Sequence, residues 1–185
     1  SANRLRRLSG ETQLWLPQLQ VLDLSQNRLG SLSPGQGASF GVFEGLGSLR
    51  HLSLAGNRLR RIREGDLAGL VQLNSLQLSD NRLDGLAEDA FASLASLESL
   101  SLASNRLAYA CKACWRPLRS LYSLDLSGNQ IGLIQSENFS PLWNLRKLFL
   151  SKNRAFRVSE HAFVGLHSLD TLKLDGISLT KLPAM

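Results

Sequence analysis

Arginine recurs at one fixed position of this chain, directly after an asparagine that is itself repeated along the sequence. These residues, which we call the arginine column, are Arg4, Arg28, Arg58, Arg82, Arg106 and Arg154, and Gln130 replaces arginine once. A guanidinium group is a planar cation whose fork of donors matches phosphate, sulfate or carboxylate. The column therefore predicts a surface for an anionic ligand, with nucleic acid as one version. The alternative is that each arginine covers buried leucines with its stem and keeps its head solvated.

Charge is separated by position, although the net charge is only +6. Twelve of the 21 basic residues fall on the four positions after each asparagine or after Ile177, which replaces the last one: Arg4, Arg6, Arg7, Arg28, Arg58, Arg60, Arg61, Arg82, Arg106, Arg154, Arg157 and Lys181. One acid, Asp84, shares these positions, and seven of the 15 acids fall on the segment that follows. The pattern predicts a basic edge beside an acidic outer surface.

A repeat of 24 residues must position this edge. The pattern L-x-x-L-x-L-x-x-N-x-L begins at Leu19, Leu49, Leu73, Leu97, Leu121 and Leu145, and a weaker copy begins at Leu169. Apolar residues recur at fixed offsets around each repeat, so a coil can bury its leucines only against the next coil. The L-x-L core alternates inward and outward, as a short strand does. We expect a solenoid in which these strands stack into one parallel sheet.

Two further columns have structural explanations. The asparagines follow each strand, where backbone groups lose their ladder partners and a side-chain amide can replace them. Ten residues later come large apolar residues, which should fill the outer side of the arc: Leu67, Phe91, Trp115, Phe139 and Phe163, with Phe43 displaced by six extra residues. The extra residues lie within 33–41 and form either a functional loop or a tolerated insertion.

The repeat resembles the typical class of leucine-rich repeat, over Asn3 to Pro183, and looks like part of a Toll-like receptor ectodomain. The resemblance implies an α/β leucine-rich repeat solenoid: a curved horseshoe with a parallel sheet on the concave face and few regular helices. It also implies ligand recognition without catalysis, in the extracellular space or endosomal lumen, as part of a type I membrane protein. In such receptors the lateral edge meets a microbial ligand and a second receptor copy or co-receptor. A matrix or cell-adhesion protein of the same class, binding glycosaminoglycan or protein, is the alternative.

We expect residues 1–185 to form a single domain of about seven repeats. The hydrophobic content of 43% and charged content of 19% indicate a folded chain. No run of 18 apolar residues occurs, so any membrane contact would come through parts absent from this chain. Neither end carries the cysteine clusters that usually close such arrays, which suggests a fragment lacking both caps.

Cys111 and Cys114 are the only cysteines. Thioredoxin-like chemistry needs such a pair between a strand and a helix, and zinc needs four ligands, so neither is favoured here. A local disulfide and partly buried thiols remain open, and no metal or cofactor is expected. Asn138 begins an N-F-S glycosylation signal, although Pro141 follows and would reduce its use.

The predicted concave surface is small and polar, except near its C-terminal end, where Arg146, Lys147, Phe149, Lys152 and Lys173 form a secondary candidate site. No Ser/His/Asp, paired-carboxylate or phosphate-loop constellation appears, so the sequence does not predict an enzyme. The candidate ligand- or partner-binding residues are Arg28, Arg58, Arg60, Arg61, Arg82, Arg106, Arg146, Lys147, Phe149, Lys152 and Arg154.

Overall fold

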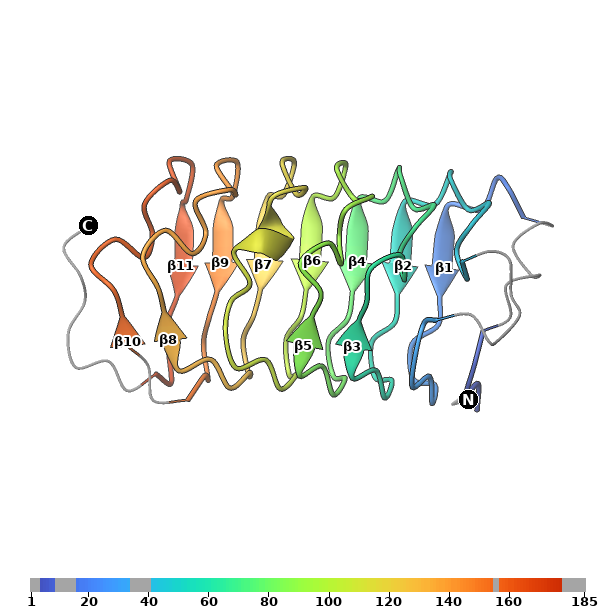
Figure 1. The fold of residues 1–185 in the computed structure, drawn as a ribbon, viewed down its shortest axis with the longest axis horizontal. Helices are drawn as coiled ribbons and strands as arrows, with labels where there is room; N and C mark the ends of the chain where they lie inside the picture. The colour runs from blue at the N-terminus through green and yellow to red at the C-terminus, as the bar shows by residue number, and fades with distance from the viewer. Residues whose placement is uncertain (1–3, 9–15, 34–40, 155–156, 178–185) are drawn as a thin grey trace.

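A computed structural model describes residues 4–8, 16–33, 41–154 and 157–177 of the 185-residue chain. The coils stack in a row, and each contributes one three-residue strand to a seven-stranded parallel sheet (Figure 1). The strands are β1 (Val21–Asp23), β2 (His51–Ser53), β4 (Ser75–Gln77), β6 (Ser99–Ser101), β7 (Ser123–Asp125), β9 (Lys147–Phe149) and β11 (Thr171–Lys173). Leu76 pairs with Leu52 on one side and Leu100 on the other. The predicted leucine-rich solenoid with few helices is confirmed.

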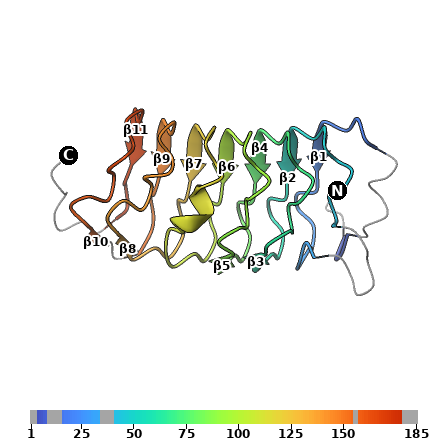
Figure 2. The same cartoon turned by 45° about the horizontal axis from the view of Figure 1, so that its top comes forward.

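A second row of shorter strands, which the sequence analysis did not predict, lies on another side of the solenoid (Figure 2). It comprises two separate pairs, β3 (Arg61–Ile62) with β5 (Gly85–Leu86) and β8 (Leu133–Ile134) with β10 (Arg157–Val158). The coil between β5 and β8 forms no such strand. It contains instead a turn of 3-10 helix, Ala113–Trp115. In the described ranges no helix is both long and apolar enough to cross a membrane.

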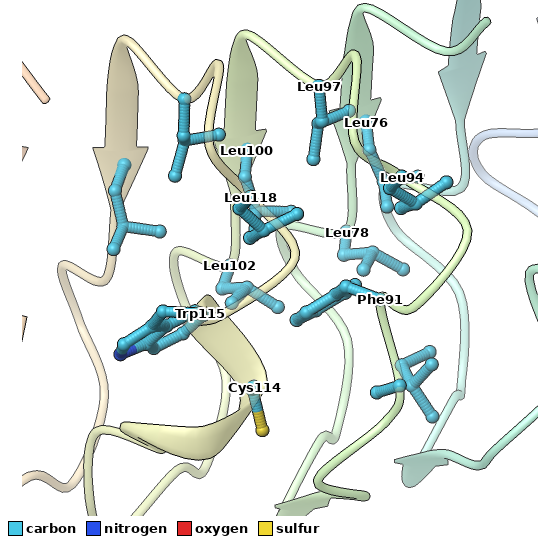
Figure 3. Close-up of a cluster of buried hydrophobic side chains, with 14 of the residues drawn as sticks. Leu76, Leu78, Phe91, Leu94, Leu97, Leu100, Leu102, Cys114, Trp115 and Leu118 are labelled. Carbon is cyan, nitrogen blue, oxygen red and sulfur yellow. The ribbon is translucent and has the colours of Figure 1, made fainter. Parts of the chain in front are cut away.

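Leucines from successive coils and a column of aromatic rings fill the interior (Figure 3). The rings of Phe91 and Trp115 stack with centroids 6.3 Å apart, and those of Phe139 and Phe163 lie 6.5 Å apart. Phe43 is also buried, in spite of the insertion before it. The predicted aromatic column is confirmed, and each buried Leu or Phe contributes about 1.5–3 kcal/mol.

The buried asparagines connect each coil to the coil before it. The Oδ1 atom of Asn81 accepts a hydrogen bond from the backbone N–H of Leu59 at 3.0 Å. Its Nδ2 donates to the carbonyl oxygens of Leu54 and Leu78, at 2.9 and 3.1 Å. The same pattern recurs at Asn57, Asn105, Asn129 and Asn153. The predicted structural role of this column is confirmed, and it fixes the position of the residue that follows each asparagine.

Candidate ligand-binding edge

The backbone of the arginine column is held by a regular hydrogen-bond ladder. The N–H of Arg58 donates to the carbonyl oxygen of Leu29 at 2.9 Å, and that of Arg82 donates to Leu59 at 2.9 Å. Arg28 and Arg106 donate to Leu5 and Leu83 in the same way, each at 2.8 Å. Consecutive coils therefore present their arginines in one register, with side chains exposed to solvent.

The N-terminal half of the arginine column lines an open groove of about 440 Å³. It is lined by Arg4, Gln26, Asn27, Arg28, Gly56, Asn57, Arg58 and Arg82. Arg106 and Arg154 continue the column beyond the groove, with Gln130 between them. The structure thus brings together Arg28, Arg58 and Arg82 of the predicted site.

These guanidinium groups are free to meet an external anion. In the described part of the chain, the salt bridges join Arg61 to Asp84 and Lys112 to Glu137, and neither involves the arginine column. Cations held close to one another without carboxylate partners repel weakly in water, by at most about 1 kcal/mol per pair. A bound polyanion would remove that repulsion and supply the missing counter-charges.

Arg60 and Arg61 lie farther along their coil than the column. Arg61 belongs to β3, where it pairs with Gly85, and its Nε atom lies 3.6 Å from Oδ1 of Asp84. The carbonyl oxygen of Arg60 accepts a hydrogen bond from the N–H of Asp84 at 3.0 Å. The basic edge predicted from sequence is therefore two neighbouring surfaces, the arginine column and the second row of strands.

Two cation–π contacts involve the secondary candidate residues of the seven-stranded sheet. Nζ of Lys147 lies 5.4 Å from the ring centroid of Tyr122, and Nζ of Lys173 lies 5.6 Å from that of Phe149. Arg146 precedes β9 and Lys152 lies in the turn after it. Tyr122, which was not among the residues selected from the sequence, therefore contacts one of these candidates. Its signal in the sequence was an aromatic residue directly before an outward-facing strand position.

Two carboxylates near this face accept hydrogen bonds from neighbouring serines. The hydroxyl of Ser151 donates to Oδ1 of Asp175 at 2.7 Å, and this bond is the main reason that the pKa of Asp175 is lowered. The pKa of Asp23 is lowered as well, first by the side chain of Ser25 and then by its backbone N–H. The seven-stranded sheet therefore presents both charges to solvent, whereas the arginines of the column form no salt bridge among the described residues.

Cys111 and Cys114 form a disulfide, with Sγ atoms 2.00 Å apart. Both lie at the 3-10 turn, in the coil that interrupts the second row of strands. No cluster of three or more potential metal ligands occurs among the described residues.

Replacing both cysteines by alanine should lower the free energy of unfolding only modestly. The bridge closes a loop of about four residues, for which the chain-entropy relation gives about 2 kcal/mol. Urea denaturation of the oxidised protein and of the double variant would measure the difference. A loss above about 5 kcal/mol would contradict a purely local role.

The glycosylation prediction for Asn138 needs correction. Asn138 is 5% exposed, its Nδ2 donates to the carbonyl oxygen of Ala110 at 2.7 Å, and its Oδ1 accepts from the N–H of Gln135 at 3.1 Å. A glycan would occupy that same Nδ2 and would need access to solvent. Asp66 occupies the equivalent position in another coil, since it lies nine residues after Asn57 as Asn138 lies nine after Asn129. Its carboxylate likewise accepts a hydrogen bond from a backbone N–H, that of Arg63, at 2.8 Å. Asn138 is therefore a structural residue that closes its turn.

Asn138→Ala should destabilise the protein by about 1–3 kcal/mol, because it leaves a partly buried N–H and a buried carbonyl unpaired. Thermal unfolding would measure the loss, with the half-buried Asn144 as the control position. The mass of protein secreted from a glycosylating host should show no glycan at Asn138. A quantitatively glycosylated and stably folded product would contradict the assignment.

Comparison with known proteins agrees with this geometry. A family model described as leucine rich repeat matches residues 36–83, 48–107, 71–131 and 119–179, and a second leucine-rich repeat model matches 18–39. The chain belongs to the leucine-rich repeat family. No curated protein matches this chain significantly.

Two solved structures show how this leucine-rich repeat chain relates to longer proteins. The first is the crystal structure of a TLR13–ssRNA13 complex, with 28% identity and a TM-score of 0.72 over 94% of this chain and 28% of that one. The second is the leucine-rich repeat protein LIC12759 of Leptospira interrogans, with 31% identity and a TM-score of 0.80 over 98% of this chain and 43% of that one. The resemblance to a Toll-like receptor ectodomain is thereby confirmed. The chain spans less than half the length of either protein.

Proposed function

We propose that this leucine-rich repeat chain is part of an extracellular pattern-recognition receptor of innate immunity, and that its arginine column binds an anionic ligand without catalysis. The observation that carries the proposal is the run of exposed arginines on consecutive coils, fixed in register and without carboxylate partners. Guanidinium groups so arranged suit a chain of phosphates. The preferred ligand is therefore a single-stranded nucleic acid that lies along the solenoid.

Two further observations support this proposal. The TLR13 structure is named as a complex with single-stranded RNA, and its fold matches almost all of this chain. The disulfide suits an oxidising compartment, which agrees with the extracellular space or the endosomal lumen. As part of a type I membrane protein, the ectodomain would also meet a second receptor copy or a co-receptor along its lateral edge. Membrane attachment would come through segments outside this chain.

Fluorescence anisotropy with a labelled single-stranded oligonucleotide tests the proposal. Unlabelled oligonucleotide and heparin should compete for the site, and neutral dextran should not. The absence of oligonucleotide binding at low salt would overturn the nucleic-acid proposal. Binding of heparin alone would favour the second candidate, a secreted matrix or adhesion protein, because sulfate also fits the guanidinium fork.

A further inference from the structure

One position in the second row of strands lacks the large side chain that four other coils place there, and one further coil has the small residue Ser31 at the equivalent position. The first residue of each short strand, or its equivalent, is Arg61, Tyr109, Leu133 and Arg157 in four coils, and all four are exposed. The coil between Arg61 and Tyr109 has Gly85. A Cβ atom added at Gly85 would meet nothing within 4 Å, so the missing side chain leaves open space.

This space is an open pocket of about 400 Å³, which we call the Gly85 pocket. Its lining comprises Arg61, Ile62, Arg63, Asp84, Gly85, Leu86, Ala87 and Tyr109. The volume lies within the range of small-ligand sites. A guanidinium stands on one side, a 57% exposed phenol ring on the other, and aliphatic residues lie between them. This arrangement suits a flat aromatic group, because both guanidinium planes and aromatic rings stack on nucleobases.

The polar groups of the Gly85 pocket suit a base edge. The carboxylate of Asp84 is 52% exposed and has a single, long ion pair to Arg61, so it can accept further hydrogen bonds. Carboxylates accept from the exocyclic amino group of cytosine. In the described ranges no backbone hydrogen bond joins Gly85 or Leu86 to the coil of Tyr109, because that coil turns into the disulfide instead of forming a strand. Figure 1 shows β3 directly beside β5 on one side and no short strand directly beside it on the other.

The Gly85 pocket also adjoins the arginine column. Arg82, which lines the groove of the column, lies two residues before Asp84 and three before Gly85 in the same coil. A strand whose phosphates follow the column would therefore pass beside the pocket. A base-paired duplex keeps its bases inside, so only an unpaired base could enter.

We propose that the Gly85 pocket holds one unpaired nucleobase, stacked between Arg61 and Tyr109 with its amino group donating to Asp84. This inference rests on the proposed function, since it places the phosphates of the same ligand on the arginine column. It adds that the protein recognises bases as well as charge, and that it prefers single strands with amino-bearing bases.

The test measures affinity for three probes: oligo(dC), oligo(dT) and an abasic oligonucleotide of the same length. Gly85→Leu fills the pocket. Leucine can occupy this position of a short strand, because Leu133 occupies the equivalent position in β8. The variant should bind oligo(dC) about tenfold more weakly and the abasic strand as wild type does, because stacking contributes about 1–3 kcal/mol per base. Gly30→Leu is the matched control, since Gly30 also has nothing within 4 Å of an added Cβ. Asp84→Asn should remove the preference for oligo(dC) over oligo(dT).

Each outcome is decisive for one of the two proposals. If wild type binds the abasic strand as tightly as oligo(dC), or if Gly85→Leu leaves oligo(dC) binding unchanged, the pocket inference is overturned and the polyanion proposal stands. An equal loss for all probes in Gly85→Leu would also overturn it, because a general effect on the fold or the edge would explain the result. If wild type binds none of the probes, the proposed function fails, and the pocket inference fails with it.

Discussion

Replacing Arg58 and Arg82 together by glutamate should weaken oligonucleotide binding by about 100-fold at low salt. Both side chains line the groove of the arginine column, and the exchange turns two attractive charges into two repulsive ones. Each exposed charge interaction amounts to about 0.2–1 kcal/mol, so four such changes sum to about 1–4 kcal/mol, a range that includes the 100-fold loss. Anisotropy titrations at constant ionic strength would measure the loss.

The matched control for this exchange is Arg116→Glu plus Arg119→Glu, which alters the net charge equally. Both arginines are exposed and lie away from the column, around the turn that follows Trp115. This control should lose no more than a few-fold in affinity, because only long-range attraction changes. Equal losses in the two double variants would mean that the overall charge, and not the arginine column, attracts the ligand.

Asn105→Ala should destabilise the solenoid by about 3–5 kcal/mol, the largest stability effect that we expect outside the leucine core. The side chain of Asn105 accepts from the N–H of Leu83 at 2.9 Å and donates to the carbonyls of Leu78 and Leu102, at 2.9 and 3.0 Å. Alanine leaves these buried groups unpaired within the solenoid, where water cannot reach them. Urea denaturation would measure the difference.

Asn74→Ala is the comparison for this stability prediction. Asn74 is half-buried and uses its Nδ2 on the carbonyl of Ser96 at 3.2 Å, outside the buried ladder. Its loss should be below about 1 kcal/mol, because water can replace a partner at the surface. If Asn105→Ala were no more harmful than Asn74→Ala, the asparagine column would not hold the coils together.

The leucine and asparagine columns could be predicted from the sequence because every coil has the same burial and hydrogen-bonding requirements. Every coil must bury its leucines against the next, and every coil leaves the same backbone groups without ladder partners after its strand. The insertion did not disturb this rule, since Phe43 still reaches the core. The insertion itself falls largely on residues 34–40, and two other positions named from the sequence are Asn3 and Lys181; all of these lie outside the described residues.

The binding surfaces were less predictable, because they depend on how one coil differs from its neighbours. The arginine column follows directly from the register, whereas Arg61 proved to lie in a second row of strands that the leucine pattern does not specify. Gly85 was visible in the sequence as a glycine where most other coils have Arg, Tyr or Leu and one has Ser31. Asn138 was misinterpreted because an N-x-S signal says nothing of burial, although its offset from Asn129 matches that of Asp66 from Asn57.

The dependence of oligonucleotide affinity on salt is the most direct measurement of the central claim that the arginine column binds phosphates. Each phosphate contact to a single strand contributes about −0.7 to the slope of log K against log salt concentration. Four arginines in contact predict a slope of about −3 for wild type, and Arg58→Ala plus Arg82→Ala should make it shallower by about 1.4. A wild-type slope near zero, or an unchanged slope in the double variant, would contradict the account.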